Sequence, residues 1–232
     1  MIPGLYNDEQ IEGNKKLTET IHKYDSKLFC QIYHPGRQST KLVNGNVIPL
    51  APSAIKDPVC QEQPKEMTVK EIKDIVKDFG DTARRVKEAG FDGIEIHAAH
   101  GYLISEFLSP FTNKRVDEYG GCFDNRVRFL VEIYAAVRKE VGEEFPLIVR
   151  ISGNEYLLGG RTEAESFELA RHCEEIGFDT IHVSNSMYAS APIDQIIAPM
   201  YTKHALNMDI SEQVKKLVSI PVIVTNRIND PK

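Results

Sequence analysis

Apolar residues along the chain follow two patterns that alternate from one end to the other. Short runs in which almost every residue is apolar predict buried strands, and longer stretches with apolar residues every three or four positions predict helices. The strand-like runs lie near residues 28, 94, 148, 181 and 223. The helix-like stretches cover residues 8–24, 69–89, 124–141, 163–176 and 210–219. A long connection that contains Pro and Asn follows the first strand, up to about residue 67.

Local signals mark where these helices begin and end. Two of them start with a capping box, in which a Thr and a Glu three residues later satisfy each other's backbone N–H groups; these are Thr68 with Glu71 and Thr162 with Glu165. Asp124 is expected to cap the helix that lies between those two. Gly90 and Gly177 supply the left-handed residue that commonly ends a helix.

Two segments of the chain repeat the same unit. "AGFDGIEIH" (89–97) and "IGFDTIHVS" (176–184) both run from a helix-ending glycine through Phe-Asp into an apolar strand. Short apolar strands that alternate with capped helices predict parallel strands covered by helices. The chain has no Gly-x-Gly-x-x-Gly after a strand, which disfavours the dinucleotide-binding doubly wound sheet. The sequence therefore predicts an α/β fold of the (β/α)8 TIM-barrel type.

A barrel of this type needs eight strands, and only the five runs above are visible. An open five-stranded parallel sheet would leave a concave face and two unpaired edges exposed to water. We therefore expect residues 1–232 to form a single, partial TIM-barrel domain, without the first two strands and the last strand of the barrel.

Composition narrows the possible partners. The 28 Lys and Arg residues against 34 Asp and Glu residues give a net charge of −6, so the chain lacks the basic surface that nucleic acids or anionic membranes attract. No apolar segment approaches the roughly 20 residues that span a bilayer, and the N-terminus lacks the regions of a signal peptide. We expect a cytoplasmic chain with a small-molecule partner and possible self-association. No CxxC spacing for a metal or iron–sulfur site occurs among the cysteines, at positions 30, 60, 122 and 173.

Polar residues cluster where the predicted strands end. Gln31 follows the first strand, His97, His100 and Tyr102 follow the second, and Arg150 lies inside the third. The carboxyl ends of the strands are the face on which barrel enzymes assemble their active sites. The shared location, more than any one of these residues, predicts a functional site.

The histidine pair is open to three interpretations. Its i, i+3 spacing at a strand end differs from the helical i, i+4 pair of zinc proteases, so a metal site has little support. The pair could instead donate two N–H groups to a carbonyl oxygen that gains charge during reduction or enolisation, with Tyr102 as an acid. The third interpretation, two histidines satisfied by backbone partners, carries as much weight for these residues alone as the two functional interpretations together.

A buried arginine needs an anion or several acceptors. For Arg150 the candidates are an ion pair with Glu95, an ion pair with Glu155, or the electron-rich edge of an anionic cofactor. Gln31 could likewise bond the edge of a heterocycle or a neighbouring loop. In the loop "NKRVDEYGGCFDNRVRF" (113–129) we expect internal ion pairs with an architectural role.

A longer segment adds a family resemblance. "FDGIEIHAAHGYLISEFLSPFTNKRVDEYGGCFDNRVRFLVEI" (91–133) resembles the signature of the old yellow enzyme family of FMN-dependent NAD(P)H:flavin oxidoreductases and ene-reductases. The segments "QIYHPGRQS", "VRIS" and "IPVIVTNRIND" extend the resemblance over nearly the whole chain. It is most similar to the branch of 2-enoate reductases, dienoyl-CoA reductases and bile-acid flavin oxidoreductases.

The resemblance implies a TIM barrel that holds FMN at its C-terminal face. Hydride passes from NAD(P)H through the flavin to the C=C bond of an unsaturated carbonyl compound. By position, His97 and His100 match the pair that binds the substrate carbonyl, and Tyr102 matches the proton donor. Gln31 matches a residue at the flavin pyrimidine edge, and Arg150 matches the cation near flavin N1 and O2.

The resemblance also assigns the region after the seventh family strand to a phosphate contact. Asn226 and Arg227 stand there, where relatives commonly have a glycine, and they are the expected cofactor residues at this place. An iron–sulfur cluster and FAD are expected only in a longer parent chain.

Two other hypotheses about the function of the chain remain. One is a flavin-free barrel lyase or isomerase that uses His97 and Tyr102 for proton transfers. The other is a truncated, inactive chain, or one that folds only when its strand edges pair with another polypeptide.

Overall fold

Five parallel strands form the main sheet of the computed structural model, which describes residues 4–190 and 196–230. The strands lie in the order β1-β4-β5-β6-β7. Their bounds are Phe29–Ile32, Gly93–Ala98, Leu147–Ser152, Thr180–Ser184 and Val222–Val224. All five predicted strands are confirmed, and every neighbouring pair is parallel, as the alternation of strands and helices predicts.

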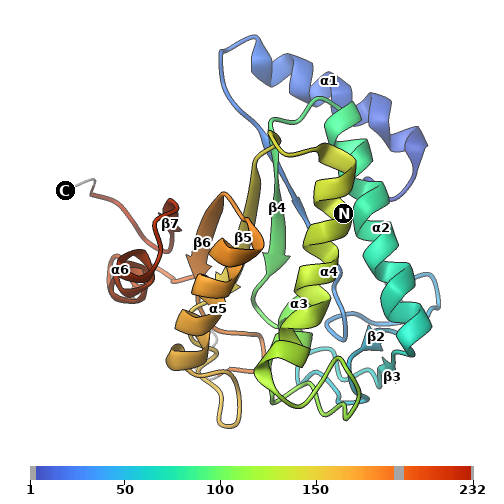
Figure 1. Cartoon of the computed structure of the whole chain (residues 1–232), viewed down its shortest axis with the longest axis vertical. Coiled ribbons are helices and arrows are strands. Elements are labelled where there is room, and N and C mark those ends of the chain that lie inside the picture. Colours follow the sequence, from blue (N-terminus) through green and yellow to red (C-terminus); the bar gives the residue numbers. More distant parts are fainter. Residues whose placement is uncertain (1–3, 191–195, 231–232) are drawn as a thin grey trace.

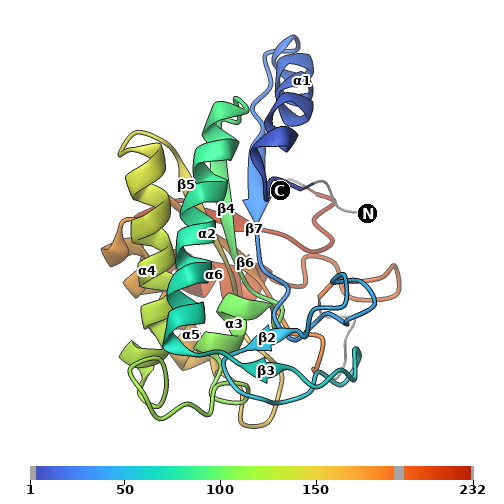
Figure 2. The same ribbon diagram turned by 90° about the vertical axis from the view of Figure 1, so that its right-hand side faces the viewer.

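Helices cover one side of this sheet (Figure 2). They are α2 (Val69–Glu88), α4 (Phe123–Val141), α5 (Glu163–Ile176) and α6 (Met208–Leu217). A 3₁₀ turn, η1 (Asp8–Gln10), leads into α1 (Ile11–His22), which lies near the end where the strands begin (Figure 1). Within the described ranges, no helix has the length and apolar content to cross a membrane.

The two faces of the sheet differ sharply in chemistry. On β4, Ile94, Ile96 and Ala98 are fully buried and belong to the core that the helices cover. Successive side chains of a strand point to opposite faces, so Glu95 and His97 lie on the other side. The strand β5 repeats this alternation. The sheet therefore carries its apolar core on the helix side and polar groups on the face that would be the interior of a barrel.

The helix caps agree with the sequence at two of three positions. Thr68 Oγ1 accepts from the backbone N–H of Glu71 at 3.2 Å, and Thr162 Oγ1 accepts from that of Glu165 at 3.3 Å. The predicted cap at Asp124 is wrong, because the N-cap is Cys122, two residues earlier, and α4 begins at Phe123. Asp124 lies in the first turn instead, where a carboxylate interacts favourably with the helix dipole.

Three short elements were not predicted, and they lie near the carboxyl ends of the strands (Figure 1). They are α3 (Leu103–Leu108) and the paired two-residue strands β2 (Leu50–Ala51) and β3 (Lys65–Glu66). All six residues of α3 are buried, so it has no polar face to reveal a helical period. The expected ion pair of the following loop is confirmed, since Arg115 forms a two-point contact with Asp117 at 2.9 and 2.5 Å.

Candidate active site

Three predicted site residues meet at the end of β4. The ring centroid of His97 lies 5.0 Å from that of His100 and 4.9 Å from that of Tyr102. Two successive residues in the left-handed region, His100 (φ 61°) and Gly101 (φ 79°), turn the chain back after the strand. A side chain with a Cβ adopts this conformation at a cost, which is typical of functional sites. The strained turn is what brings the three rings together.

Hydrogen bonds to the main chain hold this turn. Ser152 Oγ on β5 accepts from the backbone N–H of His100 at 3.1 Å. The backbone carbonyl of His100 accepts from Gln38 Nε2 at 2.7 Å. The His100 backbone is therefore held by groups from the neighbouring strand and from the loop after β1.

Both histidines are neutral at physiological pH. Burial, and then the charge of Arg150, lowers the pKa of His97 to about 3. Burial and the neighbouring His97 lower the pKa of His100 to about 2. The backbone N–H of Ala99 donates to Nδ1 of His97 at 3.2 Å, which leaves the ring proton of His97 on Nε2. His97 can thus donate a hydrogen bond from Nε2 without carrying a charge.

Tyr102 is flanked by two further tyrosines. The ring of Tyr33 lies 5.0 Å away and that of Tyr188 lies 6.0 Å away, between centroids. Burial, and then a hydrogen bond that the Tyr102 hydroxyl donates to Tyr188, raises the pKa of Tyr102 above its usual value, so its hydroxyl stays protonated at pH 7. Sequence reasoning missed Tyr33 and Tyr188, because they come from different loops and only the fold makes them neighbours.

Arg150 lies beside the histidine pair and keeps unused hydrogen-bonding capacity. It occupies the position on β5 that pairs with His97 on β4. Its Nη2 donates to Ser184 Oγ at 3.3 Å, while its buried Nε has no partner within the described part of the chain. Neither expected carboxylate forms an ion pair with Arg150 there, because Glu95 bonds His182 and Glu155 bonds Arg161. An electron-rich group that accepts from the guanidinium would complete this site.

A second polar cluster lies next to Arg150 on the same face. Nε2 of Gln31 donates to one oxygen of Glu95, and His182 Nδ1 lies 2.6 Å from the other. The ring of His182 also reaches Thr225 Oγ1 at 3.3 Å. Since the amide nitrogen of Gln31 is taken by Glu95, its Oε1 remains to accept from a ligand N–H. Sequence reasoning missed His182, although the alternate polar positions of "TIHVS" place it on the same face as Ser184.

Asn226 and Arg227 follow β7, and both have left-handed backbones (φ 85° and 57°). Together with Arg150 and Thr225 they line one pocket. Asn226 Oδ1 accepts from the backbone N–H of Ala198 at 2.8 Å. Nη1 of Arg227 donates to the carbonyls of a loop, at Pro199 (3.1 Å), Met200 (2.7 Å) and Thr202. The structure thus brings Asn226 and Arg227 near Arg150, and the loop accepts hydrogen bonds from Nη1 of Arg227.

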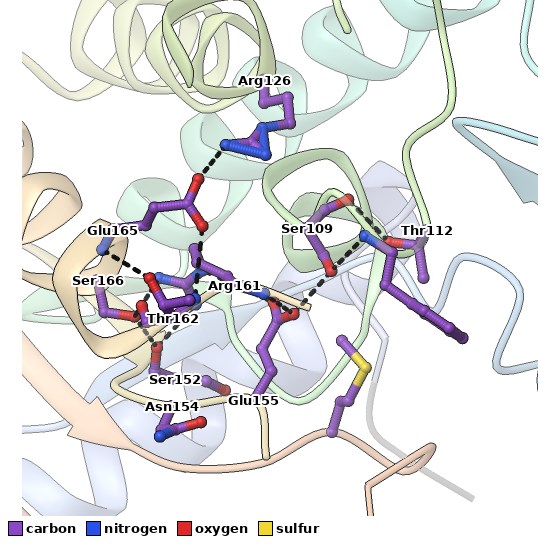
Figure 3. A network of polar contacts seen from close by, with 12 residues as sticks. Ser109, Thr112, Arg126, Ser152, Asn154, Glu155, Arg161, Thr162, Glu165 and Ser166 are labelled. Carbon is purple, nitrogen blue, oxygen red and sulfur yellow. Dashed lines mark hydrogen bonds and ion pairs between the residues drawn. The ribbon is translucent and has the colours of Figure 1, made fainter. Parts of the chain in front are cut away.

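Figure 3 shows a buried network of polar contacts around Arg161 and Glu155. Arg161 Nε lies 3.6 Å from Glu155 Oε1, and both side chains are almost inaccessible to solvent. Glu155 also accepts from Ser109 Oγ at 2.7 Å, and Arg161 Nη2 donates to the backbone carbonyl of Ser152 at 2.7 Å. Because Ser152 Oγ bonds the His100 backbone, this network extends to the site. No group of three or more His, Cys, Asp or Glu in the described ranges is arranged to hold a metal ion.

Comparison with known proteins identifies the class. A model of the NADH:flavin oxidoreductase / NADH oxidase family matches residues 1–232. The chain is 41% identical over 228 residues to a protein named NADH oxidase from Thermoanaerobacter brockii, covering 98% of this chain and 35% of that protein. These matches, together with the parallel sheet, define a TIM-barrel flavoprotein. The chain belongs to the NADH:flavin oxidoreductase / NADH oxidase family.

Solved structures support the fold. A complex of 2-naphthoyl-CoA reductase with 2-naphthoyl-CoA has a TM-score of 0.91 at 30% identity, over 98% of this chain and 36% of that one. An old yellow enzyme homologue from Zymomonas mobilis has a TM-score of 0.81 at 26% identity, over 98% of this chain and 64% of that one. The predicted barrel fold is confirmed, and the chain spans less than two thirds of each of these proteins.

Proposed function

We propose that this chain carries the catalytic face of an FMN-dependent ene-reductase. Its reaction would pass hydride from NAD(P)H through FMN to the β-carbon of an α,β-unsaturated carbonyl compound. The observation that carries the proposal is the meeting of two neutral histidines, a protonated tyrosine and an arginine with a buried, unpartnered Nε at the end of β4. Family membership supports the flavin and the nicotinamide reductant.

The histidine pair would bind the substrate carbonyl. As hydride reaches the β-carbon, negative charge builds on the carbonyl oxygen, and N–H donors fixed in a buried site stabilise that charge best. The depressed pKa values of His97 and His100 keep both rings as uncharged donors over the whole physiological range. Donors that are already in place need no reorganisation when the charge appears.

Tyr102 would deliver the proton that completes the reduction. Its ring packs edge-on against that of His97, with 4.9 Å between centroids, so Tyr102 stands next to a group that would hold the carbonyl. Its raised pKa keeps the proton on the hydroxyl until the α-carbon becomes basic. The flanking rings of Tyr33 and Tyr188 offer apolar faces to a planar conjugated substrate.

Arg150 and Gln31 would hold the flavin. When bound, FMN supplies the hydride chemistry that amino-acid side chains lack. The partnerless Nε of Arg150 fits the electron-rich edge of the ring system, where it would favour the reduced, anionic form. Gln31 Oε1 would accept from the ring imide, since Glu95 engages the amide nitrogen. Asn226 and Arg227 would contribute at the phosphate end of the same pocket.

The flavin-free lyase or isomerase is less well supported. A general base works best when its pKa lies near the working pH. The pKa values of about 3 and about 2 make His97 and His100 poor bases at neutral pH. They suit donation of hydrogen bonds better than transfer of protons.

Two half-reactions test the proposal. The chain is mixed with FMN without oxygen, NADH or NADPH is added, and the bleaching of the visible flavin absorbance is followed. Cyclohexenone is then added, and recovery of the absorbance reports alkene reduction. Bleaching followed by recovery supports an ene-reductase. Bleaching without recovery contradicts the alkene step, and bound flavin that neither coenzyme bleaches contradicts the proposed function as a whole.

A further inference from the structure

A single buried hydroxyl contacts residues to which the proposed function gives different tasks. Ser184, the last residue of β6, is 1% exposed. Its Oγ lies 2.7 Å from Nε2 of His100 and 3.3 Å from Nη2 of Arg150. His100 would bind the substrate carbonyl and Arg150 the flavin. Ser184 is therefore the direct link between the two halves of the site.

The placement of protons in this link follows from simple chemistry. An arginine guanidinium can only donate, so Ser184 Oγ accepts from Arg150. The hydroxyl then has one proton of its own to donate, and within the described residues its remaining neighbour at hydrogen-bond distance is Nε2 of His100. If Nε2 carried the ring proton instead, the buried serine proton would have no acceptor, which costs about 1–3 kcal/mol.

We propose that Ser184 is a positioning residue that accepts from Arg150, donates to Nε2 of His100 and thereby fixes the ring proton of His100 on Nδ1. The direction of donation runs from Arg150 through Ser184 to His100. Among the described residues the His100 ring forms a hydrogen bond through Nε2 and none through Nδ1, so this N–H remains for a ligand.

The two histidines would then present different nitrogens. The backbone N–H of Ala99 already places the ring proton of His97 on Nε2. Ser184 places that of His100 on Nδ1, and the two rings are nearly perpendicular, at 79°. Each ring has one nitrogen engaged by the protein as an acceptor and one N–H left to donate. That these two N–H groups bind a substrate carbonyl rests on the proposed function, whereas the position of the ring proton of His100 does not.

Nitrogen NMR of the histidine rings tests the assignment in the 232-residue chain. Two-bond ¹H–¹⁵N correlation spectra distinguish a protonated ring nitrogen from an unprotonated one, and His100→Gln identifies the signals. We expect Nδ1–H in the wild type, an appreciable Nε2–H population in Ser184→Ala, and the wild-type pattern in Ser184→Thr, which keeps a hydroxyl. Nε2–H in the wild type, or an unchanged pattern in Ser184→Ala, overturns the proposal. If Ser184→Ala does not fold, the wild-type spectrum still decides.

A ligand measurement separates this inference from the proposed function. The FMN-loaded chain is titrated with 4-hydroxybenzaldehyde, whose phenolate oxygen would take the place of the substrate carbonyl. We expect Ser184→Ala to weaken binding about fivefold to tenfold, as loss of one hydrogen bond implies. Ser184→Thr should bind like the wild type, as should the control Ser211→Ala, whose buried hydroxyl donates to the backbone carbonyl of Asn207, the N-cap residue of its own helix. Full affinity in Ser184→Ala overturns the proposal.

The two claims can fail separately. In one outcome, the chain binds no phenol, but the ring proton of His100 lies on Nδ1 and leaves it in Ser184→Ala. That outcome contradicts the proposed function and supports the role of Ser184. A chain that reduces alkenes with His100 as Nε2–H supports the proposed function and contradicts the role of Ser184.

Discussion

Glu95 and His182 are hydrogen-bonded across the inner face of the sheet, with 2.6 Å between Oε2 and Nδ1, although 87 residues separate them along the chain. They lie on β4 and β6, so the contact passes over β5 between them. The other oxygen of Glu95 accepts from Gln31 on β1. One carboxylate therefore ties three strands together beside Arg150 and fixes which end of the Gln31 amide faces a ligand.

Removal of this carboxylate should weaken flavin binding through Gln31. We expect Glu95→Ala to lower FMN affinity about tenfold, because hydrogen bonds to charged groups contribute roughly 1.5–3 kcal/mol. Gln31→Ala should cause a similar loss, and the double variant should lose little more than either single variant. FMN titrations of the four proteins measure these affinities. Fully additive losses would show that Glu95 and Gln31 act independently.

Tyr102→Phe should separate the two half-reactions. The variant lacks the proton donor, so we expect alkene reduction to slow about 100-fold or more, in keeping with general acid catalysis. Reduction of the flavin by NAD(P)H should proceed at the wild-type rate, because that step needs no proton from Tyr102. Stopped-flow absorbance measures each half-reaction. The control Tyr33→Phe keeps the neighbouring ring and should leave both rates close to the wild type, and equal loss of both half-reactions in Tyr102→Phe would refute its role.

The buried ion pair between Arg161 and Glu155 should contribute strongly to the free energy of unfolding. Arg161→Leu would leave Glu155 buried without its cation, at a cost of about 3–5 kcal/mol in free energy of unfolding. Lys216→Ala removes the exposed partner of Glu212 and should cost less than about 0.5 kcal/mol. Urea unfolding followed by circular dichroism compares both variants with the wild type. If Arg161→Leu and Lys216→Ala lost similar free energy of unfolding, the claim that burial makes the Arg161–Glu155 pair important for stability would be contradicted.

Glu106 should make stability depend on pH. Burial raises its pKa from 4.5 to about 8, against an opposing effect of Arg37. Between these values the folded state keeps a proton that the unfolded chain releases, so the contribution of Glu106 to stability is complete below pH 4.5 and is lost as the pH rises toward 8.

Glu106→Gln should remove this dependence, because the amide oxygen can still accept from the backbone N–H of Arg37. Relative to the wild type, we expect the variant to gain roughly 3–4 kcal/mol between pH 5 and pH 8, as a shift of this size implies. Urea unfolding of both proteins at pH 5 and at pH 8 gives the difference between their free energies of unfolding. His97 and His100 contribute equally in the two proteins, so their effects cancel in this difference. A constant difference between the two proteins would show that Glu106 ionises normally.

The strands and the larger helices could be predicted from sequence because their signals are local. The Thr68 and Thr162 capping boxes need only four residues each, and both formed. The Asp124 cap failed because a Cys with an extended backbone can occupy the cap position without a side-chain bond. The helix α3 could not be seen, since burial of its whole surface removes the amphipathic period.

The site was predictable only in part, for a similar reason. His97, His100 and Tyr102 lie within six residues of one another, so one strand end brings them together. The partners of Arg150 depend on the register between strands that are distant in sequence, which no local pattern encodes. Of the three candidate partners of Arg150, neither Glu95 nor Glu155 forms an ion pair with it among the described residues, since Glu95 contacts His182 and Glu155 contacts Arg161. The roles of Gln31, Asn226 and Arg227 toward a flavin stay predictions.

Titration of the 232-residue chain with FMN, followed through its visible absorbance, tests the central claim most directly. We predict saturation at one FMN per chain with a shifted visible band, and binding at least tenfold weaker in Arg150→Leu, which lacks the guanidinium beside the flavin. Cys122→Ser, a change at an exposed position outside the site, should bind like the wild type. A spectrum that stays that of free FMN, or equal affinity in Arg150→Leu, would contradict a flavin site at Arg150.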